Sequence, residues 1–157
     1  MFSPIINDIT TTHPNEPQFQ HLKKLNPNRD YAYREEFYSI QQEAYPEVHP
    51  LRVAGEPNSI FQTVLDYARA QRRWQIVHFD ESLYRIEAVA TTRLLRFKDD
   101  IVIELRKSGH ADDLFEIHMR SKSRLGRGDL GANAKRIQDF FSKISKDLRA
   151  NSGDSEK

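Results

Sequence analysis

The sequence predicts an α+β domain, built from a four- to five-stranded antiparallel meander sheet with two main helices packed on one face and an extended N-terminal arm. Two segments with helical apolar spacing, 59–72 and 130–148, flank four segments in which apolar and polar residues alternate. Only short polar links join these four segments, which favours antiparallel neighbours, because parallel strands need long crossovers. The apolar face of such a sheet must be covered, and two amphipathic helices can cover it.

The first main helix is expected from Ser59 to about Arg72. Ser59 and Gln62 match a capping box, in which the two side chains bind the free N–H groups of the first turn. The apolar stripe that follows comprises Ile60, Phe61, Val64, Leu65 and Ala68. The second helix is expected from about Leu130, and its stripe comprises Ile137, Phe140, Phe141, Ile144 and Leu148.

The four strands are expected over 74–79, 84–91, 101–106 and 115–122, the last two as a hairpin around "KSGHADD". Their alternation directs a set of charged side chains to an open sheet face: Arg85, Glu87, Glu104, Arg106, Glu116 and Arg120. Because acids and bases alternate there, the face suits cross-strand ion pairs and offers no stacking platform for RNA. We therefore expect no nucleic-acid partner.

Residues 1–33 contain several Pro and Asn turns and no sustained apolar period, so we expect an extended N-terminal arm. Residues 34–148 are expected to form a single α+β domain. At its start Phe37, Ile40 and Ala44 predict a short amphipathic helix ended by Pro46, and "HPLRVAGEP" could supply an edge strand. Residues 149–157 are expected to be a disordered tail.

Composition limits the classes of function. The 24 Lys and Arg residues against 23 acidic residues leave a formal net charge of +1, so any electrostatic binding must be local. Without cysteine there is no disulfide, thiolate metal site or Cys nucleophile. The start, "MFSPIINDITTTHPNEP", lacks a signal-peptide pattern, and we expect a cytoplasmic protein, or a membrane-associated one if the true start lies upstream.

The stretch "GRGDLG", residues 126–131, spells G-x-G-x-x-G and contains the adhesion tripeptide Arg-Gly-Asp. A dinucleotide fold needs a second parallel strand after the helix, and only a polar tail follows here. Nothing marks the chain as secreted, so an adhesion role is not supported either. Two interpretations stay open: Asp129 caps the last helix, or the free N–H groups of that helix hold an anion.

Four blocks of residues carry a resemblance to a known family: "INDITT" (6–11), "AYPEVHPL" (44–51), "ATTRLLRFKDDIVI" (90–103) and "RSKSRLGRGDLGANAKRI" (120–137). Over roughly residues 6–143 the chain resembles the bacterial and plastid domain-of-unknown-function family 1499. The resemblance implies the fold and the important loops, but the family brings no settled activity. Where the family usually has serine, this chain has Gly128, so the dinucleotide-like spacing is accidental. Family members often carry a membrane segment or lipoprotein-type start ahead of the domain, whereas here only "MFSPI" precedes the first block.

The polar residues shared with the family gather in the loops before the third strand and before the last helix, where shared polar chemistry indicates a role. The candidate ligand-binding residues are Arg93, Asp99, Asp100, Arg120, Arg124, Asp129 and Asn133. The alternative is a structural network in which the arginines pair with Asp99 and Asp100. Neighbouring strand residues face opposite sides, so the two aspartates are not expected to converge.

The leading hypothesis is a non-enzymatic domain that binds an acidic small ligand, a lipid head group or a protein partner through this Arg/Asp cluster. One alternative is a hydrolase-like enzyme with Asp99 or Asp100 as general base, and another is an envelope-associated scaffold. No catalytic residue, cofactor or metal is assigned: the six histidines lack metal-ligand spacings, and Ser121 and Ser123 lack the nucleophile-elbow glycines. Peripheral membrane association stays open.

Overall fold

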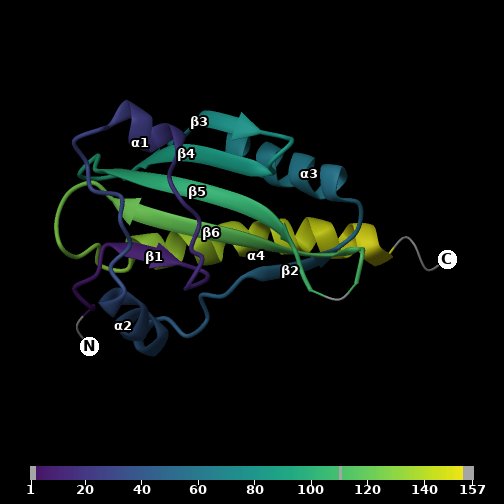
Figure 1. Cartoon of the computed structure of the whole chain (residues 1–157), viewed down its shortest axis with the longest axis horizontal. Coiled ribbons are helices and arrows are strands. Elements are labelled where there is room, and N and C mark those ends of the chain that lie inside the picture. The colour runs from purple at the N-terminus through teal and green to yellow at the C-terminus, as the bar shows by residue number, and fades with distance from the viewer. Residues whose placement is uncertain (1–2, 110, 154–157) are drawn as a thin grey trace.

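Four strands follow one another as an antiparallel meander in the computed structural model, which describes residues 3–109 and 111–153 (Figure 1). They are β3 (Trp74–Asp80), β4 (Arg85–Thr91), β5 (Lys98–Lys107) and β6 (Leu114–Ser123). Two short strands, β1 (Asp8–Thr10) and β2 (Leu51–Ala54), pair in tandem with the outer edge of β6. The sheet order is β1-β6-β5-β4-β3, with all pairs antiparallel and the sheet not closed. The predicted α+β meander is therefore confirmed, with six strands in place of four to five.

Two helices cover one face of the sheet, as expected: α3 (Pro57–Ala70) and α4 (Ala132–Gly153). Their apolar stripes pack on the side chains that alternate strand residues direct to this face. The strand side chains of this main core include Ile86, Ile101, Ile103, Ile117 and Met119. The capping box predicted at Ser59 is wrong, because α3 begins two residues earlier, at Pro57. The side chain of Glu56 caps it by accepting hydrogen bonds from the N–H groups of Asn58 and Ser59, at 3.0 and 2.8 Å.

The opposite face of the sheet is not open. The N-terminal segment crosses it in front of β4 and β5 and includes a short helix, α1 (His21–Leu25) (Figure 1). A second, smaller core lies beneath this segment and consists of Phe19, Leu22, Tyr31, Val89 and Val102. The expectation that the charged side chains of this face point to solvent is therefore corrected for two of them, because Glu87 and Arg120 are buried. His118, on the same face, is buried too.

The buried carboxylate of Glu87 has a structural explanation. It accepts hydrogen bonds from the backbone N–H groups of Gln20, His21 and Leu22, at 3.1, 2.8 and 3.2 Å. These are the N–H groups that a helix leaves without internal partners at its start. A strand residue thus caps α1 from across the sheet face, whereas the side chain of the N-cap residue, Gln20, makes no capping hydrogen bond.

A further helix, α2 (Glu36–Ala44), lies beside β1 and ends before Pro46, as predicted. Its buried Gln41 exchanges two hydrogen bonds with the backbone of Thr10, at 3.0 and 2.7 Å, and so completes the edge of β1. The predicted tail, 149–157, falls partly outside the described residues; within them α4 continues to Gly153. Among the described residues no helix is long and apolar enough to span a bilayer.

Candidate functional site

Two loops lie together at one end of the sheet. One, residues 92–97, joins β4 to β5, and the other, residues 124–131, joins β6 to α4. They meet because Asp99, which follows the first loop, pairs in register with Ser123, which precedes the second. A cavity of about 480 Å³ opens between them, a volume in the range of small-molecule sites. It is lined by Thr92, Arg93, Leu94, Leu95, Phe97, Asp99, Ser123, Leu125, Gly126, Gly128, Asp129, Leu130 and Ala132.

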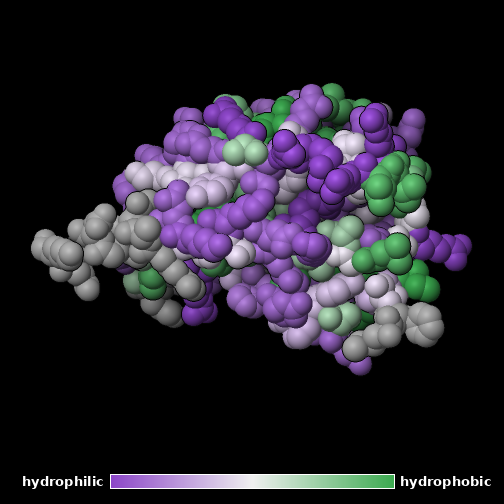
Figure 2. Space-filling model, turned by 180° about the vertical axis from the view of Figure 1, so that it is seen from behind, coloured by the Kyte–Doolittle hydropathy of each residue, from purple (hydrophilic) through white to green (hydrophobic). Residues whose placement is uncertain are grey.

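The walls of this cavity are apolar and exposed. Six of the eleven large hydrophobic residues that are exposed among the described residues gather here: Ile5, Leu94, Leu95, Phe97, Leu125 and Leu130. We call these six residues the apolar tip. Leu94 is 89% and Leu130 88% exposed. Figure 2 shows hydrophobic side chains gathered at this end of the molecule, beside a largely hydrophilic helical face.

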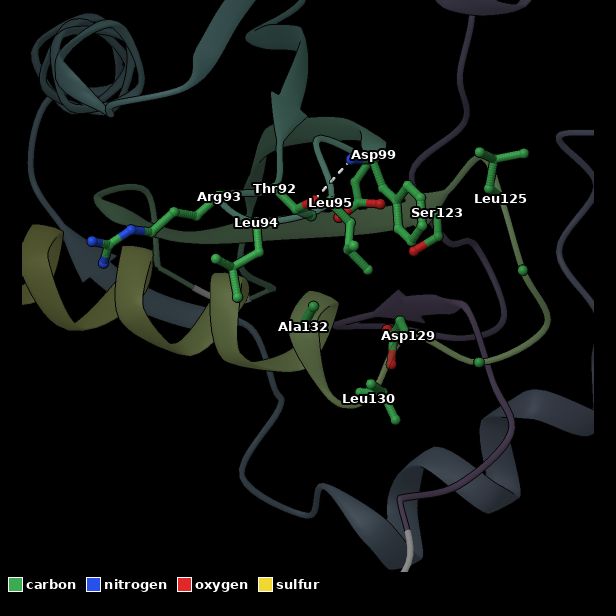
Figure 3. Close-up of a pocket in the computed structure, with 13 residues that line it drawn as sticks. Thr92, Arg93, Leu94, Leu95, Asp99, Ser123, Leu125, Asp129, Leu130 and Ala132 are labelled. Carbon is green, nitrogen blue, oxygen red and sulfur yellow. Dashed lines mark hydrogen bonds between the residues drawn. The ribbon is translucent and has the colours of Figure 1, made fainter.

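The close-up in Figure 3 shows how the loop side chains are directed. Leu94 and Leu95 reach from their loop towards Ala132 and Leu130 at the start of α4. The side chain of Arg93 points away from them, along the helix. Leu130 adopts a φ of 54°, in the left-handed region that leucine rarely occupies. The backbone there is strained while the side chain is left in solvent, a combination that often marks a functional loop.

The floor of the cavity carries a buried carboxylate, that of Asp99. Its Oδ2 lies 2.7 Å from Nη2 of Arg136, although the described residues give this oxygen no well-directed hydrogen bond. Burial raises the pKa of Asp99, and the charge of Arg136 and the hydroxyl of Ser123 oppose the rise. The floor of the cavity therefore holds the carboxylate of Asp99 together with the guanidinium of Arg136, which neutralises its charge.

Asp129 and Asn133 form the corner between β6 and α4. Asp129 caps α4, because its carboxylate accepts hydrogen bonds from the N–H groups of Gly131 and Asn133, at 2.8 and 3.3 Å. The side chain of Asn133 is completely buried and donates to Asp129 and Ser123, at 2.7 and 2.8 Å, while its oxygen accepts from Ser121 and Arg136. Of the two interpretations of "GRGDLG", the capping role of Asp129 is thus confirmed.

Asp100 faces the other side of the sheet. Its carboxylate accepts hydrogen bonds from the hydroxyl of Tyr31 and from Nε of Arg124, at 2.8 and 2.9 Å. Burial and this hydrogen bond raise the pKa of Tyr31. The three side chains border a polar hollow of about 290 Å³ that also includes Arg29 and Lys122.

Arg120 also lies on that side, completely buried beneath the N-terminal segment. Its guanidinium donates two hydrogen bonds to Asp8, at 3.0 and 2.8 Å, and two more to the carbonyl oxygens of Pro17 and Tyr31. The guanidinium also lies over the ring of Phe19, 4.8 Å from its centroid. Four of the five N–H donors of Arg120 are thus engaged within the protein, and its completely buried guanidinium is closed to a ligand.

The structure divides the seven candidate residues into two groups. Arg93, Asp99 and Asp129 line the cavity, with Asn133 behind it, whereas Asp100, Arg120 and Arg124 face the N-terminal segment. Sequence reasoning missed Arg136 and the apolar tip. The signal for the tip was present in "LLRF", 94–97, where adjacent leucines interrupt the alternation of a strand. The described residues contain no group of His, Asp and Glu side chains arranged to hold a metal ion.

The comparison with protein families agrees with the sequence resemblance. A family model described as "Protein of unknown function (DUF1499)" matches residues 8–144. We find no match among curated proteins. Among solved structures, the chain is similar to one described as "Crystal structure of conserved protein from Geobacillus kaustophilus", with 14% sequence identity and a TM-score of 0.32. That alignment covers 64% of this chain and 93% of the other.

Proposed function

The chain belongs to the DUF1499 family of proteins of unknown function, and from its geometry we propose that it is a non-enzymatic domain that attaches to anionic lipid surfaces through the apolar tip. The observation that carries the proposal is the concentration of exposed leucines at one end of the molecule. Scattered exposed apolar residues are ordinary, whereas a contiguous apolar patch indicates an interaction surface. A tip at the end of an elongated sheet can enter a membrane interface without burying the rest of the domain.

Basic residues around the apolar tip favour a lipid surface over a protein partner. Arg93, Arg96, Lys98 and Arg127 are exposed in or beside the two loops, and within the described chain none lies in an ion pair. The two acids of the floor and cap are already engaged, Asp99 by Arg136 and Asp129 by the start of α4. Each Lys or Arg near an anionic membrane contributes roughly 1 kcal/mol, and apolar side chains add burial at the headgroup boundary.

Sedimentation with lipid vesicles tests the proposal. We expect binding to phosphatidylglycerol vesicles that weakens as salt is raised, and little binding to phosphatidylcholine vesicles. Leu94→Asp combined with Leu95→Asp should weaken binding by more than about tenfold. Leu83→Asp is the matched control, because Leu83 is a 59% exposed leucine in the turn at the opposite end of β4.

Leu130→Gly separates binding from folding. Glycine tolerates the positive φ of this position, so the variant should keep its stability to within about 1 kcal/mol while losing one apolar side chain of the tip. We expect weaker vesicle binding with an unchanged unfolding transition. Absence of binding to anionic vesicles at low salt would overturn the proposal. So would capture of a protein partner through the apolar tip without any vesicle binding.

A second candidate function is a hydrolase-like reaction with Asp99 as general base. It is favoured by the raised pKa of this carboxylate at the floor of an apolar cavity, the pattern that perturbed catalytic acids and bases show. Asp100 is the weaker choice for this role, because Tyr31 and Arg124 occupy its carboxylate. Turnover of para-nitrophenyl dodecanoate that Asp99→Asn abolishes, with vesicle binding unchanged, would favour the enzyme.

A further inference from the structure

Another cavity, of about 370 Å³, lies between the turn from α3 to β3 and the side of α4. Its lining is rich in cations, with Arg72, Arg73, Arg136 and Lys143 against the single carboxylate of Asp139. That carboxylate is paired with Lys135 at 2.6 Å. We call this cavity the basic groove.

The basic groove and the cavity at the apolar tip adjoin each other. Arg136 lines the groove while its Nη2 lies 2.7 Å from Asp99, on the floor of the apolar cavity. The backbone N–H of Thr91 donates to the carbonyl oxygen of Arg73 at 2.8 Å, so the loop that bears Leu94 and Leu95 starts at the wall of the groove. Arg93 also extends from that loop along α4, away from the leucines (Figure 3).

Three of the four cations that line the groove form no ion pair within the described residues. Arg136 is neutralised by Asp99, and Lys143 donates only to the amide oxygen of Gln71, at 3.1 Å. Arg72 and Arg73 are exposed and, within the described residues, neither forms an ion pair. An anionic group placed here would meet Arg72, Arg73 and Lys143, while the one acid of the lining, Asp139, is engaged by Lys135. Charge-assisted hydrogen bonds of this kind are the strong ones.

We propose that the two cavities form one bipartite site for an anionic amphiphile: a single alkyl chain lies in the apolar cavity, and its carboxylate or phosphate head lies in the basic groove. The proposal rests on the proposed function only in assigning the leucines to an apolar ligand. Ala132 lines the first cavity and Lys143 the second, eleven residues apart on α4, which corresponds to about 16 Å. That span suits a long chain with a terminal head better than a small ion.

Trp74 provides the readout, because it lines the basic groove and is the sole tryptophan of the chain. Fluorescence titrations below the micellar concentration would use dodecyl phosphate and dodecanoate as the two anionic amphiphiles. Dodecanol supplies the same chain without charge, and inorganic phosphate the charge without a chain. We expect both anionic amphiphiles to bind at least about tenfold more tightly than dodecanol or phosphate alone.

Variants assign the two ends of the ligand. Arg72→Ser combined with Lys143→Ser should weaken dodecyl phosphate and dodecanoate by about tenfold and leave dodecanol unchanged. Leu94→Asp with Leu95→Asp should weaken all three alkyl ligands. Arg52→Ser, an exposed arginine on β2, is the control that should change none of them.

Equal affinity for dodecanol and dodecyl phosphate would overturn the proposal, as would equal affinity for inorganic and dodecyl phosphate, or no binding at all. Tighter binding of dodecanoate than of dodecyl phosphate would indicate a fatty acid as the ligand, and the reverse would indicate a phosphate monoester. Either result supports the site. This inference and the proposed function fail separately. Vesicle binding without capture of monomeric amphiphiles overturns only the bipartite site, and the converse overturns only membrane attachment.

Discussion

The guanidinium of Arg120 and the carboxylate of Asp8 form a doubly hydrogen-bonded ion pair with both side chains at most 1% exposed. The pair joins β6 to β1, and the same guanidinium donates to the carbonyl oxygens of Pro17 and Tyr31. Arg120 therefore fixes three points of the N-terminal segment to the sheet. A buried charge that loses its main partner is costly, because burial keeps water from replacing it. The nearest remaining cation is Lys122, whose Nζ lies 3.7 Å from Oδ2 of Asp8.

Arg120→Met should therefore destabilise the domain by about 3 kcal/mol, since it removes both hydrogen bonds of the pair and leaves the buried Asp8 only the more distant Lys122. Denaturant unfolding measures the change. Arg52→Met, at an exposed arginine, should stay within about 0.5 kcal/mol of the parent. Adding Asp8→Asn to Arg120→Met should recover part of the loss, because the uncompensated charge is removed. A loss below about 1 kcal/mol for Arg120→Met would contradict the assigned role.

Glu87→Gln should loosen the N-terminal segment. The glutamate accepts three hydrogen bonds from the first N–H groups of α1, and an amide offers one oxygen in place of two. We expect a loss of roughly 1 to 3 kcal/mol and faster amide hydrogen exchange at Gln20, His21 and Leu22. Glu81→Gln, in the exposed turn after β3, should leave both measurements unchanged. Unchanged exchange in Glu87→Gln would show that the cap contributes nothing to the order of α1.

His118 predicts a pH dependence of stability. Burial lowers its pKa, as does the charge of Arg106, while Glu116, whose Oε2 lies 3.0 Å from Nε2, opposes the shift. In the window between the lowered folded pKa and the unfolded value near 6.5, the unfolded state binds the proton and the folded state does not. The free energy of unfolding should therefore fall as the pH falls through this window. His118→Gln should remove that component, and His49→Gln, at an exposed histidine, should retain it. Parallel stability curves for the parent and His118→Gln would contradict the prediction.

The spacing of apolar residues was sufficient to predict the meander, because apolar and polar residues alternate along β3 to β6 and short links join these strands. It could not predict the second layer. Glu87 and Arg120 satisfy the alternation rule for an outward face, and nothing local distinguishes an outward charge from one buried under a distant segment. Their partners, at Gln20 to Leu22 and at Asp8, lie more than sixty residues away in sequence, so the burial is a tertiary property.

In the candidate site, too, the local features were predictable from the sequence and the tertiary contacts were not. Asp129 was predictable as a cap, since an acid just before a helix has one common local role. The pairing of Asp99 with Arg136, in contrast, depends on how α4 lies across β5. The neighbouring aspartates were expected to diverge, and they do so, with Asp99 towards α4 and Asp100 towards Tyr31. One polar cluster in sequence thus becomes two networks on opposite faces of the sheet.

The glycines of "GRGDLG" allow a matched pair of substitutions. Gly131 has a φ of +81°, and a Cβ there would lie 3.3 Å from the hydroxyl oxygen of Tyr45. Gly131→Ala should therefore destabilise the domain by about 1 kcal/mol or more, because both the backbone and the space oppose a side chain. Chemical unfolding of the purified variant measures the loss.

Gly128→Ser is the counterpart, and it restores the residue that the resemblance to the family implies at this position. A Cβ at Gly128 meets the backbone of Pro4 and Ile5 only at ordinary contact distances, 3.6 to 3.8 Å. We expect its stability to match the parent within about 0.5 kcal/mol. If Gly128→Ser proved as damaging as Gly131→Ala, the loop would need glycine at both positions, and the serine of the family could not occupy the conformation found here. If both were neutral, Gly131 would not be required for the left-handed turn that exposes Leu130. The exposure of Leu130 in the apolar tip would then need another explanation.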